Sequence, residues 1–111
     1  MHVSLITFPA NDLTATKHFF RELIGSDPYA DYPQYIGYRD GAMEIGLVPK
    51  EHGPGALPFW TVSDIAATLK ALEAAGGTVV REISDVGYGL LVAAIKDPNG
   101  SVVGLRQPPK G

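Results

Sequence analysis

The sequence contains no cysteine, which excludes disulfides, zinc–thiolate sites and a cysteine nucleophile. It has no apolar run near the ~20 residues that a membrane-spanning helix needs, and its first residues lack the basic segment of a secretory signal peptide. Neither sign of charge dominates, because 9 Lys and Arg against 12 Asp and Glu give a net charge of −3 without a basic stripe. We therefore expect a cytoplasmic protein that binds neither nucleic acid nor membranes.

The chain is long enough for one domain, and we predict a single α+β domain over residues 1–111. Apolar residues make up 45% of the chain, which is enough to build a core. Its 13 Gly and 9 Pro predict many turns between short elements.

The first half of the chain predicts a strand, a helix and three more strands. Pro9 is expected to end the first strand, and Asp12 then offers a side-chain oxygen as a helix N-cap. Gly25 lies where a left-handed residue closes a helix, and Asp40-Gly41 is a hairpin turn. The strands are predicted over residues 3–8, within 26–33, over 34–39 and over 42–48.

The second half repeats this order after a linker rich in Gly and Pro. Asp64 is the helix cap, Gly76-Gly77 ends the helix, and the residues 97–100 form a type I turn. The strands are predicted over 59–62, 78–83, 90–96 and 101–106. The repeats span residues 1–50 and 56–107. Since one helix cannot cover both faces of a sheet, the copies must pair, either within one chain or between two.

Three segments resemble the vicinal oxygen chelate superfamily, which includes glyoxalase I, bleomycin resistance proteins and extradiol dioxygenases. They are Asp12-Leu13 with His18-Phe19-Phe20-Arg21-Glu22-Leu23-Ile24-Gly25, Val62-Ser63-Asp64-Ile65 through Gly77, and Asp97-Pro98-Asn99-Gly100 with Gly104-Leu105. The resemblance implies a glyoxalase/bleomycin resistance-like fold of two βαβββ modules, each a cupped mixed sheet with one helix. It also implies a homodimer.

The same resemblance places four metal ligands on the first and last strand of each module. The equivalent positions here are Leu5, Gly46, Leu57 and Gly104. None of these side chains has a donor atom, so we predict no metal and no other cofactor. We expect an apolar, roomy site instead, in which the glycines let a ligand approach the strand backbone.

Alternation along the strands extends this set to a predicted ligand-binding wall. Together with Tyr88, its members are Leu5, Thr7, Glu44, Gly46, Leu57, Phe59, Thr61, Gly104 and Arg106. A mostly apolar wall with few polar groups suits a small organic ligand, possibly an aromatic one. The residues of the opposite alternation are expected to pack against the helices; they are Ile6, Phe8, Trp60 and Val62.

Several polar residues leave alternatives open. Glu44 is the one candidate catalytic residue, as a general base, and Arg106 could grip an anionic ligand; the two could equally neutralise each other or reach solvent. Tyrosines 29, 32, 35, 38 and 88 could stack on a planar ligand, or cover an edge strand or a dimer contact. Histidines 2, 18 and 52 are expected at the surface, and Asp97 is expected to be a turn residue.

Three functions follow from these observations. The first is a metal-free small-molecule binding protein, comparable to resistance proteins that sequester a drug. The second is a metal-free enzyme, a glyoxalase-like lyase or isomerase in which Glu44 transfers a proton. The third is a metal-dependent lyase, isomerase or dioxygenase whose ligands lie elsewhere in the chain.

Overall fold

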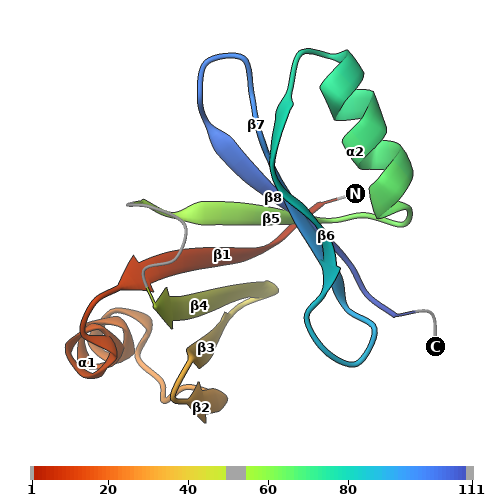
Figure 1. Cartoon of the computed structure of the whole chain (residues 1–111). Helices are drawn as coiled ribbons and strands as arrows, with labels where there is room; N and C mark the ends of the chain where they lie inside the picture. The colour runs from red at the N-terminus through yellow and green to blue at the C-terminus, as the bar shows by residue number, and fades with distance from the viewer. Residues whose placement is uncertain (1, 50–54, 110–111) are drawn as a thin grey trace. The chain divides into compact units, whose positions relative to one another are not determined.

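The computed structural model describes residues 2–49 and 55–109, and in this part of the chain the order strand, helix, three strands occurs twice (Figure 1). The elements are β1 (His2–Ala10), α1 (Leu13–Ile24), β2 (Ala30–Tyr32), β3 (Tyr35–Asp40), β4 (Met43–Pro49), β5 (Leu57–Thr61), α2 (Ile65–Ala74), β6 (Thr78–Asp85), β7 (Leu91–Lys96) and β8 (Val102–Gln107). The predicted α+β class and the two βαβββ modules are confirmed.

The chain divides into two compact units, which are described separately. The N-terminal unit is Ser4–Leu57, and the C-terminal unit is Pro58–Gly111 together with Met1–Val3. The predicted linker falls mainly on residues 50–54, and His52 with it, so both lie outside the described residues.

The N-terminal unit has the strand order β2-β3-β4-β1. Strand β1 is parallel to β4, with Leu5 beside Glu44 and Thr7 beside Gly46. Strand β3 is antiparallel to β4, with Arg39 opposite Glu44. Since paired residues share a face of a sheet, these side chains belong to one face.

Helix α1 covers the other face of this sheet. Asp12 caps it by accepting a hydrogen bond from the Ala15 N–H at 3.1 Å, and Gly25 ends it at φ 89°. The buried residues Ile36, Tyr38 and Leu47 form the core beneath the helix, and Phe8 packs against them. No residue of α1 is itself buried.

The C-terminal unit has the matching strand order β5-β8-β7-β6. Strand β5 is parallel to β8, with Phe59 beside Gly104 and Thr61 beside Arg106. Helix α2 covers the opposite face, where it buries Ile65 and Leu69. Trp60 and Val62 are in this core, as the alternation predicted.

The observed strands differ from the predicted ones mainly at their ends. The prediction that Pro9 ends β1 is wrong, because the strand continues to Ala10, which is paired with Pro49 of β4. Strand β6 runs to Asp85 through two register shifts, so part of the predicted loop 84–89 is strand. Neither α1 nor α2, the helices of the described residues, is long and apolar enough to cross a membrane.

Candidate ligand-binding site

In each unit one face of the sheet is not covered by that unit's helix, and we call it the helix-free face. In the N-terminal unit this face carries Leu5, Thr7, Glu44 and Gly46 from the predicted wall. Leu57 belongs to the same unit, and its carbonyl oxygen accepts a hydrogen bond from the buried Thr7 hydroxyl at 3.5 Å. The strands therefore bring together the residues that alternation assigned to this unit.

Three residues surround Glu44 on the helix-free face, and with it they form the tyrosine–glutamate cluster: Tyr29, Tyr35, Arg39 and Glu44. The hydroxyl groups of Tyr29 and Tyr35 both donate to Oε2 of Glu44. The guanidinium carbon of Arg39 lies 4.5 Å from the centre of the Tyr29 ring, within cation–π range. One carboxylate oxygen thus has both of its lone-pair directions engaged.

The phenols of this cluster are held in their neutral, donating form. Burial and the neighbouring Glu44 carboxylate raise the pKa of Tyr29 to about 12. The same two causes raise the pKa of Tyr35 further. Both hydroxyl groups therefore remain hydrogen-bond donors at neutral pH.

The tyrosine rings also fill the space over two glycines. A Cβ atom at Gly46 would lie 2.7 Å from Cε1 of Tyr35, and one at Gly37 would lie 2.9 Å from Cε1 of Tyr29. Glycine is needed at both positions because any side chain there would collide with a ring.

The C-terminal unit also has an aromatic ring packed over a glycine on its own helix-free face. The buried ring of Phe59 lies over Gly104, so that a Cβ at Gly104 would meet three ring carbons closer than 3.0 Å. Thr61 and Arg106 share this face and are half-buried. The expectation of a roomy site at Gly46 and Gly104 is therefore wrong within each unit: aromatic rings occupy the space that the glycines leave.

Tyr88 is apart from this arrangement. It lies at the tip of the β6–β7 hairpin with φ 56°, a left-handed conformation, and its side chain is fully exposed. The predicted wall is thus divided between the units, with Phe59, Thr61, Tyr88, Gly104 and Arg106 in the C-terminal one. A cavity built from both halves, and an ion pair between Glu44 and Arg106, stay predictions.

The four positions at which the family resemblance places metal ligands do not fit a metal ion. Two are leucines and two are glycines, so no side-chain donor is present, and a ring covers each glycine. Elsewhere in the described ranges, no group of three or more His, Asp and Glu side chains is placed to hold a metal.

The remaining polar candidates have local roles. Asp97 accepts hydrogen bonds from the N–H groups of Asn99 at 2.9 Å and Ser101 at 2.8 Å, which confirms it as a turn residue. His2 and His18 are exposed, as expected. Tyr38 is fully buried under α1, where its hydroxyl donates to the Lys17 carbonyl oxygen at 2.7 Å.

Sequence reasoning missed that Tyr29 and Tyr35 are the hydrogen-bond partners of Glu44. A signal was present for Tyr35, because strand alternation from Arg39 puts Gly37 and Tyr35 on one face, and the Asp40-Gly41 turn sets Arg39 opposite Glu44. No comparable signal existed for Tyr29, which reaches the cluster from an irregular segment.

Residues 2–105 match the Glyoxalase/Bleomycin resistance protein/Dioxygenase superfamily. The lactoylglutathione lyase of Haemophilus influenzae is 33% identical over 108 residues, which cover 80% of this chain and 79% of that protein. The chain belongs to this superfamily.

Solved structures share the fold at lower identity. A hypothetical protein from Bacillus halodurans has a TM-score of 0.80 at 14% identity, over 99% of this chain and 96% of that one. Methylmalonyl-CoA epimerase from Mycobacterium tuberculosis has a TM-score of 0.77 at 17% identity, over 97% of this chain and 88% of that one.

Proposed function

We propose that the protein binds a small organic ligand without a metal ion, at the helix-free face of its units. The observation that carries this proposal is the chemistry of the four positions at which the resemblance places metal ligands. Residues without donor atoms stand at all four ligand positions, and Tyr35 and Phe59 cover the two glycines. The family's scaffold is kept, and none of these four side chains offers a donor to a metal ion that would polarise a substrate.

The chemistry of the two faces indicates the class of ligand. Leu5 and Leu57 accompany Thr7 in the N-terminal unit, and Phe59 accompanies Thr61 and Arg106 in the C-terminal unit. Such a mixture suits a mostly apolar molecule, such as an aromatic compound, with one or two polar anchors. Arg106 would pair with an acidic group on the ligand.

The test is metal analysis together with a thermal-shift screen. Protein purified without chelators is expected to contain no stoichiometric nickel, zinc, manganese or iron. In a panel of aromatic natural products and short keto acids, we expect at least one compound to raise the melting temperature, since a ligand that binds only the native state stabilises it.

Two variants connect a positive result to the proposed surface. Arg106→Gln is expected to weaken binding, whereas Arg21→Gln, on the exposed surface of helix α1, is the matched control and is expected to leave it unchanged. Near-stoichiometric metal that restores the melting temperature after chelation would refute the metal-free proposal. Equal binding by both variants would refute the assignment of the ligand to the helix-free face that carries Arg106.

A metal-free lyase or isomerase is the second candidate, and the named activity of the Haemophilus influenzae relative favours it. In that case Glu44 would transfer the proton, from a carboxylate that the hydroxyl groups of Tyr29 and Tyr35 hold in place. Recovery of the bound compound decides between the candidates, since a binding protein returns it unchanged. Glu44→Gln would abolish turnover in the enzyme, and Glu82→Gln is its control.

A further inference from the structure

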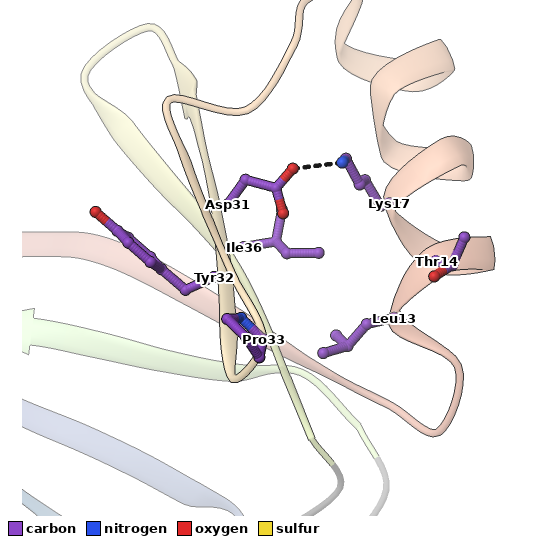
Figure 2. A pocket seen from close by; sticks show the side chains of 7 residues that line it. All are labelled: Leu13, Thr14, Lys17, Asp31, Tyr32, Pro33 and Ile36. Carbon is purple, nitrogen blue, oxygen red and sulfur yellow. Dashed lines mark hydrogen bonds and ion pairs between the residues drawn. The ribbon is translucent and has the colours of Figure 1, made fainter.

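A second hollow lies in the N-terminal unit, on the side of the sheet that α1 covers. It has a volume of about 420 Å³ and lies between the first half of α1 and the β2–β3 hairpin (Figure 2). It shares no residue with the proposed surface on the helix-free face, so its function is a separate question. Its size is within the range of small-molecule sites.

The floor of this pocket is apolar. Leu13 from α1 and Ile36 from β3 point toward each other across it, and Pro33 closes the lower end in Figure 2. The Tyr32 ring points away from the cavity. A branched aliphatic group could therefore be held between helix and hairpin by apolar contact alone.

The opposite end of the pocket carries one charge of each sign. The ammonium of Lys17 and the carboxylate of Asp31 form an ion pair there, drawn as a dashed line in Figure 2. Their side chains are 38% and 49% exposed, so both can reach a ligand from solvent. Exposed pairs of this kind are weak in water, and exchanging their partners costs little.

We propose that this pocket binds a small zwitterion with an apolar tail, of the α-amino acid class. The ligand's carboxylate would meet Lys17, its ammonium would meet Asp31, and its side chain would lie between Leu13 and Ile36. The pocket's two charges sum to zero, so a ligand with only one charge gains one contact and is repelled by the other residue. A dipolar ligand gains both contacts.

The probes that test this are L-leucine and two analogues of similar shape that keep one charge each. The analogues are 4-methylpentanoate, which lacks the ammonium, and 3-methylbutylamine, which lacks the carboxylate. In ¹H–¹⁵N spectra of the intact chain, leucine is expected to shift the Thr14, Lys17 and Ile36 amides in a saturable way. It should bind about tenfold more tightly than either analogue, as expected if each charge contributes separately.

The variants Lys17→Met and Asp31→Asn should each weaken leucine binding by about tenfold. The control Lys70→Met, which changes an exposed lysine of α2, should leave it unchanged. Absence of shifts at the pocket, equal affinity for all three probes, or unchanged binding in both pocket variants would each overturn the proposal. Because the metal analysis and the Arg106→Gln test involve neither Lys17 nor Asp31, the two proposals can fail independently.

Discussion

Two phenol groups donate to a single carboxylate oxygen of Glu44, and this fixes what that residue does in the resting protein. The carboxylate orders Tyr29 and Tyr35, and these rings in turn cover Gly37 and Gly46. Glu44 is therefore first a structural anchor of the helix-free face. Any chemical role would be added to that one.

Alkaline titration tests the cluster. Because the folded-state pKa of Tyr29 is raised from 10.0 to about 12, its neutral form is the one that folding favours. This contribution to stability is complete below pH 10.0 and is lost as the pH rises through about 12. The absorbance of tyrosinate should accordingly show Tyr29 and Tyr35 ionising well above the ordinary tyrosine pKa of 10.0.

Tyr29→Phe and Tyr35→Phe should each remove one late-titrating group and reduce the loss of stability above pH 10.0. Tyr88→Phe, at a fully exposed position, is the control and should leave both late-titrating groups in place. Ionisation of Tyr29 and Tyr35 near pH 10.0 would show that the hydrogen bonds to Glu44 do not persist in solution.

The close approach of Phe59 to Gly104 gives a second prediction for single residues. Gly104→Ala should lower the free energy of unfolding by about 1–3 kcal/mol, because the new methyl group overpacks against the ring. In urea denaturation, Phe59→Leu combined with Gly104→Ala should cost less than the two single changes added together. A neutral Gly104→Ala, or strict additivity, would contradict the packing described.

The two helices occupy equivalent places in their units but are buried to different extents. Helix α2 buries Ile65 and Leu69, whereas α1 buries none of its residues and leaves Phe19 and Leu23 62% and 68% exposed. Helix α1 thus exposes apolar side chains that do not contribute to the core of its own unit. A matched pair of leucines, one on each helix, measures the difference.

Leu69→Ala should lower the free energy of unfolding by about 2–5 kcal/mol, because Leu69 is only 6% exposed and its removal leaves a cavity. Leu23→Ala should change it by no more than about 0.5 kcal/mol in the monomer. Urea denaturation at two protein concentrations checks both values. A large cost for Leu23→Ala would mean that another surface covers that side chain.

At the level of elements, the sequence was sufficient for most of the fold. Asp12, Gly25 and Asp64 marked the helix ends correctly, because capping depends on residues close in the chain. The end of β1 was misjudged, because parallel pairing with β4 extends the strand through Pro9. Which side chains meet across strands, as Tyr29 meets Glu44, depends on the path of residues 25–29 and has no local signal.

The whole chain has the scaffold of its superfamily, with leucine or glycine at the four positions where the resemblance places metal ligands. Membership of the glyoxalase/bleomycin resistance/dioxygenase superfamily explains the duplicated module, but it does not assign an activity. Of the candidate site, the residues on each helix-free face could be predicted by strand alternation from the four positions that the resemblance marks. The sequence did not reveal the rings over the glycines, because that packing depends on side-chain conformation.

A homodimer is the expected assembly, as the family resemblance implies, and the exposed apolar residues of α1 give a physical reason for it. Light scattering at micromolar concentration should give twice the 11.8 kDa mass of the chain. Leu23→Asp combined with Phe19→Ser should shift the protein toward monomer if α1 is part of the contact. A monomeric wild-type chain would contradict the expectation.

The covered glycines also bear on the history of this chain. Changing Gly104 to glutamate would introduce a donor atom but would drive its side chain into Phe59, and the same holds for Gly46 and Tyr35. A metal ligand at either position therefore needs two substitutions, one of the glycine and one of the ring that covers it. Replacing the glycine first causes a clash with the ring, and replacing the ring first leaves a void, so either single change is destabilising. On the metal-free proposal, the absence of these ligands would act as an evolutionary ratchet that selection on single mutations does not readily reverse.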